Sequence, residues 1–401
     1  MSKCMAVNAG SSSLKYKLFE MPGEKVICSG LVDRIGHDDG IFKIKYDGKT
    51  HQEILPIYSH TQGAKIVLDA LTNFGIVKSL EEIVCVGHRV VQGGKYFSHS
   101  VEFNEDTEEK IRILTPLDPL HAPAHLIGYH AFKDALPSAK AIAVFDTAFH
   151  QTMEPEDYLF PIPYEMSEKH DCRRYGAHGT SHLYLSLKGN HDYLEDKKDT
   201  RIITCHLGSG ASLCAIKNGK CVATSMGLTP LGGVMMGTRS GDLDPSVLYY
   251  LCDVEHKSVE EMYNILNKQS GFLGVSGVSN DTRDVYDAIL KGDKRSMLAA
   301  KLWARRVADY IGSYFVRLGG ADLIIFSGGI GENAAYYRSL VLDNVKEALG
   351  IVVDEEKNEK AVGVQYLISK PESKIKVCVI PTDEEVMIAR DCEAFLEGKL
   401  K

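Results

Sequence analysis

The sequence predicts an α/β protein made of two duplicated halves. Segments with strand-like and helix-like patterns alternate along the chain. A short motif of apolar residues followed by glycine and serine occurs at residues 5–14 and again at 203–213. The length of 401 residues also exceeds the ~150 residues of one ordinary domain.

In the first half, strand candidates come first and helices follow. The segment 61–74 repeats apolar residues at helical spacing (Ala64, Val67, Leu68, Leu71), which predicts an amphipathic helix. Runs of apolar and alternating residues predict strands at 4–8, 14–20, 25–35, 41–46, 83–91 and 139–145.

In the second half, residues 296–318 form a long helix candidate that stops at Gly319 and Gly320, as helices often do. A short buried strand at 323–326 runs into Ser327, and a last strand at 376–380 precedes a helix from residue 382 to the end. The segment 150–165, which contains three prolines, is the best linker between the halves.

The repeated motif is the most useful indication of domain organisation. Each copy has an apolar strand, a polar residue (Asn8 or His206), a glycine two positions later, small hydroxyl residues and a second strand. Duplicated halves would place two such hairpins face to face across a cleft. The alternative is that the two copies are unrelated, because Gly-Ser turns between strands are common.

Composition limits the classes of partner. The chain is 44% hydrophobic and 25% charged, with a net charge of −8, so it is neither disordered nor a general binder of nucleic acid or of membrane surfaces. No apolar run approaches the ~18 residues of a membrane span. The ten cysteines include no Cys-x-x-Cys motif, which gives no support to a zinc knuckle and favours free thiols in a reducing cytoplasm.

Three turns could bind phosphate through their backbone N–H groups. They are residues 8–13 with Lys15 just beyond, residues 206–212, and residues 327–333 between a strand and a helix. The sequence has neither a Walker motif nor a protein-kinase motif. Three such turns in one chain favour a nucleotide or another phosphorylated ligand.

Charged residues also follow strand ends and glycines. Arg89 and Asp146 come at the ends of two strand candidates, His178 and Arg239 lie in Gly-rich segments, and Asp281 to Arg283 form a further group. Arginine can bind a carboxylate or a phosphoryl group through two hydrogen bonds, which suits an anionic substrate. Any single arginine could instead form a surface ion pair.

Two pairs of histidines four residues apart raise the alternative of a zinc hydrolase. His178 and His182 form one pair, and His121 and His125 form the other. Gly179 lies inside the first pair and Pro123 inside the second, and neither pair has the glutamate that follows the first histidine in zincins. Core packing or a structural hydrogen bond is the simpler explanation for each histidine.

Longer motifs resemble those of the acetate kinase family. Residues 8–15 (Asn-Ala-Gly-Ser-Ser-Ser-Leu-Lys) resemble its first signature. Residues 226–245, which run from Met-Gly-Leu-Thr-Pro to Gly-Asp-Leu-Asp-Pro, resemble its second signature. Shorter motifs around Arg89, Asp146, His178, Asn333 and Glu385 follow in the family's order, so the resemblance extends from residue 4 to about residue 391.

The resemblance implies a fold, a division into domains and a reaction. The fold is that of sugar kinases, actin and heat-shock ATPases, with two duplicated α/β domains and the active site in the cleft between them. Residues 1–150, completed by a C-terminal helix at 386–401, would form the N-terminal domain, and residues 151–385 the nucleotide-binding domain. The implied enzyme is a cytoplasmic homodimer that phosphorylates acetate reversibly with ATP and Mg²⁺, which Mn²⁺ can replace. A chaperone-type ATPase is disfavoured because no residues remain for a peptide-binding domain.

The resemblance also implies residue roles. Asp146, His178 and Arg239 would be catalytic, Arg89 would hold the substrate carboxylate, and Asn8 and Glu384 would lie beside the metal, with Glu385 as the alternative to Glu384. The small apolar pocket for the acetate methyl group would be lined by Val91, Leu120 and Pro230. The nucleotide would contact Lys15, His206, Leu207, Gly208, Ser209, Gly210, Asp281, Thr282, Arg283, Gly329, Ile330, Gly331, Glu332 and Asn333.

One residue departs from the family pattern. Many members have phenylalanine where this chain has Ala177, beside His178, and that phenylalanine helps to line the methyl pocket. The smaller side chain leaves more room, which makes a propionate or other short-chain acyl kinase the alternative function.

Overall fold

The computed structural model describes residues 2–119 and 121–400, and the chain divides into two compact units. The first consists of Met1–Phe149 with Asp383–Lys401, and the second of His150–Thr382. The boundaries expected from the sequence followed residues 150 and 385. The proline-containing segment expected as a linker lies inside the second unit and forms α4 (Pro155–Tyr158) and the start of α5 (Tyr164–His170).

The first unit contains a mixed sheet in the order β5-β4-β3-β2-β1-β6-β8-β7. Strands β1 to β5 pair antiparallel in sequence order, β1, β6 and β8 run parallel, and β7 is antiparallel to β8. The strands are β1 (Ser2–Ala9), β2 (Ser13–Met21), β3 (Lys25–Asp33), β4 (His37–Tyr46), β5 (Lys49–Ile57), β6 (Ile83–Val90), β7 (Val101–Glu102) and β8 (Lys140–Phe145).

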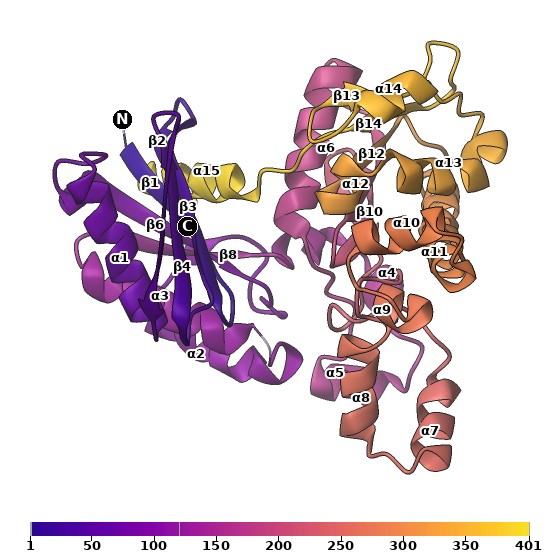
Figure 1. Ribbon diagram of the computed structural model, residues 1–401, viewed down its shortest axis with the longest axis horizontal. Coiled ribbons are helices and arrows are strands. Elements are labelled where there is room, and N and C mark those ends of the chain that lie inside the picture. The colour runs from indigo at the N-terminus through magenta and orange to yellow at the C-terminus, as the bar shows by residue number, and fades with distance from the viewer. Residues whose placement is uncertain (1, 120, 401) are drawn as a thin grey trace. The chain divides into compact units, whose positions relative to one another are not determined.

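Helices pack against both faces of this sheet. Val86 of β6 lies in an apolar cluster with Phe132 of α3, and the next residue, Gly87, faces α15. A Cβ atom on Gly87 would lie 2.3 Å from Ile388 Cγ2, so only glycine allows α15 to approach so closely. Figure 1 shows α15, in yellow, beside the indigo strands. The helical segments are α1 (His60–Asn73), η1 (Leu80–Glu82), α2 (Glu105–Leu114), η2 (Thr115–Leu117), α3 (Ala122–Ala135) and α15 (Glu384–Leu396).

The second unit contains a sheet in the order β11-β10-β9-β12-β14-β13. Strands β9, β10 and β11 are antiparallel neighbours, β9, β12 and β14 run parallel, and β13 is antiparallel to β14. The strands are β9 (Arg201–Leu207), β10 (Ala211–Lys217), β11 (Lys220–Thr224), β12 (Leu323–Ser327), β13 (Tyr366–Leu367) and β14 (Lys376–Val379).

The two sheets share one arrangement. In each, an antiparallel hairpin begins the sheet, its first strand is followed by two parallel strands, and a short antiparallel strand closes the edge. Asn8 pairs with Lys15 in one hairpin, and His206 pairs with Ser212 in the other. The repeat read from the sequence is therefore a repeat of structure, and the predicted duplication is confirmed.

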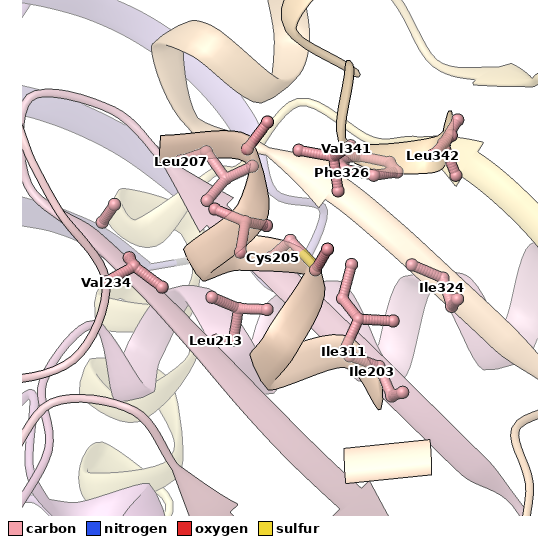
Figure 2. Packing of buried hydrophobic residues seen from close by; sticks show 14 of the residues in the cluster. Ile203, Cys205, Leu207, Leu213, Val234, Ile311, Ile324, Phe326, Val341 and Leu342 are labelled. Carbon is pink, nitrogen blue, oxygen red and sulfur yellow. The ribbon is translucent and has the colours of Figure 1, made fainter. Parts of the chain in front are cut away.

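Alternate residues of β9 build the core of the second unit. Ile203, Cys205 and Leu207 point to one face of the sheet, where Ile311 of α11 and Val341 of α13 pack. Figure 2 shows these side chains together with Phe326 of β12. The helical segments are η3 (Ala148–Thr152), α6 (Gly179–Leu194), α7 (Pro245–Val254), α8 (Val259–Lys268), α9 (Gly271–Ser276), α10 (Thr282–Leu290), α11 (Lys294–Leu318), α12 (Gly328–Asn333), α13 (Ala335–Leu349) and α14 (Glu355–Lys360).

The sequence predicted the end of the longest helix correctly. Helix α11 stops at Gly319, whose φ of 69° is the left-handed conformation that terminates helices. Among the helices formed by residues 2–119 and 121–400, none combines the length and apolar character needed to cross a membrane.

Candidate active site

In the first unit, the site residues meet where two parallel strands end. Arg89 on β6 is opposite Val144 on β8, and the Asp146 N–H donates to the Val90 carbonyl at 2.9 Å. Because the carboxyl ends of neighbouring parallel strands lie at the same edge, the side chains of Arg89 and Asp146 come together there.

Arg89 and Asp146 form a two-point ion pair. Arg89 Nη2 donates to Asp146 Oδ2 at 2.6 Å, and Nε donates to Oδ1 at 3.1 Å. The Asp146 side chain is fully buried and that of Arg89 is 18% exposed. Among the described residues, Arg89 Nη1 makes no hydrogen bond, so its two N–H groups remain available for another anion.

Two consecutive glutamates at the start of α15 face different partners. Glu384 Oε2 lies 3.9 Å from Arg89 Nε, whereas Glu385 Oε2 lies 3.4 Å from Lys17 Nζ. Burial raises the pKa of Glu384 to about 7; Arg89 acts in the opposite direction and Asp146 adds to the rise. Glu384 is therefore the glutamate in close contact with Arg89, whereas Glu385 pairs with Lys17 and acts on Arg89 only at longer range.

The other predicted residues of the first unit lie nearby in the sheet. Asn8 is partly buried on β1, and Lys15 is exposed on β2. Val91 follows β6, and its backbone N–H donates to His125 Nε2 at 3.2 Å. Leu120, predicted to line the acyl pocket, is outside the described residues.

In the second unit, His178 and Arg239 flank the turn between β9 and β10. A Cβ atom on Gly210 would lie 3.5 Å from Arg239 Nη1 and 3.6 Å from His178 Cε1. Arg239 Nη1 also donates to the Pro230 carbonyl at 3.3 Å. The turn therefore places one cation, one imidazole and the backbone of Gly210 around a single small space.

Hydroxyl groups orient the histidines of this site. His178, in the left-handed conformation at the start of α6, bonds Ser212 Oγ through Nδ1 at 2.8 Å and stacks on His206 with ring centroids 4.2 Å apart. His206 Nδ1 bonds Ser181 Oγ at 2.8 Å. These bonds fix the planes of the two rings, and His178 Nε2 faces Gly210.

Beside this group is a cavity of about 410 Å³ within the second unit. Each of the three nucleotide-contacting segments predicted from the sequence contributes to its wall. The lining residues are Gly208, Ser209, Gly237, Asn280, Asp281, Thr282, Arg283, Gly329, Ile330, Asn333 and Ala334. Arg283, whose side chain is 87% exposed, pairs with Asp281 at the rim.

Two polar side chains, one partly and one fully buried, hold the segment at the start of α12. Glu332 Oε1 accepts hydrogen bonds from the N–H groups of Gly328 at 2.9 Å and Thr382 at 3.1 Å. Arg338, which is 1% exposed, donates to the Gly331 carbonyl at 2.9 Å. Glu332, predicted as a nucleotide contact, is thus engaged with the loop itself.

Two residues that support the site had no sequence signal of their own. Ser212, whose hydroxyl group bonds His178 Nδ1, was noticed only as part of the repeated motif. Arg338 resembles an ordinary helix residue in the sequence. The histidine pairs considered for zinc are occupied otherwise, because both nitrogens of His182 bond hydroxyl groups and both nitrogens of His125 bond backbone groups.

A nucleotide-sized cavity next to an arginine–histidine pair, in a duplicated α/β fold, defines a phosphotransferase. A family model described as "Acetokinase family" matches residues 3–390. The chain therefore belongs to the acetokinase family.

Relatives with high similarity include an enzyme and two solved structures. The acetate kinase of Bacillus velezensis is 49% identical over 98% of both chains. The structure of Porphyromonas gingivalis acetate kinase aligns with a TM-score of 0.92 and 45% identity over 99% of this chain and 100% of the other. A propionate kinase from Francisella tularensis aligns with a TM-score of 0.92 and 40% identity, covering 98% of this chain and 99% of the other. The predicted fold class, two duplicated domains of the sugar kinase, actin and heat-shock ATPase type, is confirmed.

Proposed function

We propose that this protein transfers the γ-phosphoryl group of ATP to acetate, forming acetyl phosphate and ADP, and that it also catalyses the reverse reaction. The observation that carries the proposal is the meeting of Arg239, His178 and the Gly210 backbone beside the nucleotide cavity. An oxygen of the acetate carboxylate attacks the γ-phosphorus, and the bond from that phosphorus to the bridging oxygen of ADP breaks. Negative charge spreads over the phosphoryl oxygens during transfer, and cationic and N–H groups stabilise it.

In this reaction, Arg239 and His178 bind the oxygens of the transferred phosphoryl group. The backbone N–H groups of residues 206–210 and the α12 loop bind the nucleotide phosphates, together with Lys15, and Asp281 to Arg283 contact the nucleoside at the cavity rim. The absence of a side chain at Gly210 keeps the space for the phosphoryl group open.

Arg89 holds the acetate carboxylate through Nη1. Acetate is already ionised at neutral pH, so it needs no general base. Asp146 therefore serves to orient Arg89, since it occupies Nε and Nη2 and directs Nη1 outward. We assign Val91, Leu120 and Pro230 to the binding of the methyl group, because the resemblance to the family gives them this role and their side chains are apolar.

The oxygen donors of the first unit suit a hard divalent cation. Asp146, which is fully buried, and Glu384, whose side chain is 16% exposed, share one arginine, so the two carboxylates carry one more negative charge than Arg89 balances. Mg²⁺ prefers such oxygen ligands. We assign Asn8 and Glu384 as the residues that would hold Mg²⁺ or Mn²⁺, whose charge would neutralise the nucleotide phosphates.

The runner-up function is a propionate or other short-chain acyl kinase. The first reason is Ala177, which stands in place of the phenylalanine common in the family; the residue is buried, at 3% exposure, and its smaller side chain would leave more room beside the acyl group. The similarity to a propionate kinase at 40% identity is the second reason to keep this alternative.

We further propose that the enzyme is a cytoplasmic homodimer. Helices α7 and α8 carry exposed apolar residues, among them Tyr249 at 80% and Tyr250 at 63% exposure. The two helices pack against each other, and exposed apolar residues gathered on neighbouring helices are typical of a contact surface. All ten cysteines are free thiols, which suits a reducing compartment.

The hydroxamate assay for acyl phosphates tests the proposal. Acetate, propionate and butyrate are supplied as competing acceptors with ATP and Mg²⁺. The highest kcat/KM is expected for acetate. ATP hydrolysis that does not depend on any acid would instead indicate an ATPase switch, and a preference for propionate would establish the runner-up.

A further inference from the structure

Three side chains of types that can bind metal ions lie close together in the interior of the second unit. His150 Nδ1 lies 3.2 Å from Cys221 Sγ and 4.0 Å from Cys214 Sγ, and the two sulfur atoms are 3.3 Å apart. All three residues are fully buried. None of them has a role in the reaction proposed above.

An irregularity in the β10–β11 hairpin brings the two cysteines together. The pairing shifts register, from Ala215 opposite Ala223 to Ile216 opposite Cys221. Opposite residues of an antiparallel pair point to the same face, and so do residues two apart on one strand. Cys221 therefore shares a face with Ile216 and with Cys214. Without the shift, Cys221 would point to the opposite face.

A backbone carbonyl orients His150 toward the sulfur atoms. His150 Nε2 is 3.1 Å from the Ala177 carbonyl oxygen, which can only accept a hydrogen bond. Nε2 therefore carries the ring proton, and Nδ1 presents its lone pair to Cys214 and Cys221. Metal-binding histidines are oriented in the same way, by a carbonyl or carboxylate on the nitrogen that does not bind the metal.

The separations of the three atoms match the dimensions of a metal site. A point equidistant from the two sulfur atoms and Nδ1 lies about 2.1 Å from each of them, close to the zinc–nitrogen distance of about 2.0–2.1 Å and the zinc–sulfur distance of about 2.3 Å. Two thiolates would neutralise Zn²⁺, so a zinc-loaded site would bring no net charge into the core, whereas a site loaded with Cu⁺ would carry one negative charge.

We propose that Cys214, Cys221 and His150 bind one thiophilic metal ion, Zn²⁺ or Cu⁺. Thiolate and imidazole ligands select these ions over Mg²⁺. On binding, each cysteine loses its S–H proton to solvent and forms a sulfur–metal bond, and no oxidation or reduction takes place. Cu⁺ can be held by the three ligands alone, whereas Zn²⁺ would take a water as its fourth ligand.

The ion would stabilise the support of His178. The Ala177 carbonyl, which His150 binds, directly precedes His178. Ser212, which bonds His178 Nδ1, shares a face of β10 with Cys214. A metal ion would thus connect the start of the second unit to the strand that orients this histidine, as a structural site rather than a catalytic one.

Metal content of the full-length, untagged protein tests the proposal. The protein is purified without chelators, and a second sample is unfolded under anaerobic conditions and refolded with Zn²⁺, Co²⁺ or Cu⁺. Elemental analysis is expected to find about one ion per chain, and Co²⁺ to give a thiolate-to-cobalt charge-transfer band. Whether Zn²⁺ or Cu⁺ is retained after dialysis identifies the ion.

The double variant C214A/C221A should retain less than about a tenth of the wild-type metal. The matched control C205A/C378A removes two buried cysteines of the same sheet and should bind metal like the wild type. If C214A/C221A does not fold, X-ray absorption of the loaded wild type decides, with two sulfur and one nitrogen neighbours expected.

Three results would overturn the proposal. The first is native and refolded protein without metal, and the second is metal retained by C214A/C221A. The third is a disulfide between Cys214 and Cys221 in place of the site, detected as a mass lower by two hydrogen atoms and located by peptide mapping. Each readout is independent of acetate kinase activity, so the site can fail while the proposed reaction stands.

Discussion

Replacing Arg89 with alanine should affect both activity and stability. Asp146 is fully buried and receives its charge-assisted hydrogen bonds from Arg89. Removing one partner of a buried ion pair typically costs about 3–5 kcal/mol, because the other charge is left uncompensated. Loss of the substrate-binding cation should also lower kcat/KM for acetate by about 10²- to 10³-fold.

The double variant R89A/D146N separates the two effects. Asparagine is neutral and needs no counter-charge, so the double variant should recover part of the stability lost in R89A. Its activity should stay low, because Arg89 is still missing. The variant R89K keeps the charge and loses the two-point geometry, so its stability should lie between wild type and R89A.

The stability measurement must report on the first unit. Trp303, the one tryptophan in the sequence, lies in the second unit, so its fluorescence follows that unit. Hydrogen exchange of peptides from β6 and β8 during urea unfolding is therefore the suitable assay. Wild-type kcat/KM for acetate in R89A would refute the substrate role, and unchanged exchange would refute the stabilising pair.

Three further predictions concern specificity, acid stability and loop support. The variant A177F should raise the ratio of kcat/KM for acetate over kcat/KM for propionate, because the larger side chain leaves less room for the extra methylene, which is worth about 1–3 kcal/mol in an apolar pocket. An equal or smaller ratio would show that Ala177 does not shape the pocket. Burial lowers the pKa of His88 from 6.5 to about 3. Between these values the unfolded state binds a proton that the folded state does not, so the stability of the protein should fall as the pH drops from 6.5 toward 3. The variant H88F should lessen this loss, and an unchanged acid transition in H88F would contradict the role of His88. Arg338 donates hydrogen bonds to the carbonyls of Gly331, Asn358 and Ala361. The variant R338M should therefore destabilise the protein by about 3 kcal/mol. It should also raise KM for ATP more than it lowers kcat, and an unchanged KM would contradict this support of the loop.

The fold was predictable where apolar residues follow a clear period. The expected strands at 83–91 and 323–326 match β6 and β12 to within one residue, and helix 61–74 matches α1 equally well. Strand β5 was missed because most of its residues are exposed, so it has no alternating pattern. No helix was predicted in the segment that forms α7 to α10, since these helices are short and α7 has no buried residue.

The candidate site was predictable where a residue lies at the end of a strand or directly after it. Arg89, near the end of β6, and Asp146, directly after β8, are examples, because parallel strands bring their ends together. Contacts between distant segments could not be read from the sequence: nothing local distinguishes Glu384 from Glu385, and the face on which Cys221 lies depends on one irregular pair in a hairpin.

The C-terminal helix has a consequence for biosynthesis. Because α15 packs against β1, β2 and β6, the sheet made first by the ribosome remains uncovered on one face until residues 383–401 have emerged. The second unit is one continuous stretch, His150–Thr382, and has all its residues before then. The unit that is synthesised second can therefore fold first. A chain that terminates early, before Glu384, would leave apolar Ile388 contacts unmade and release a nascent protein prone to aggregation.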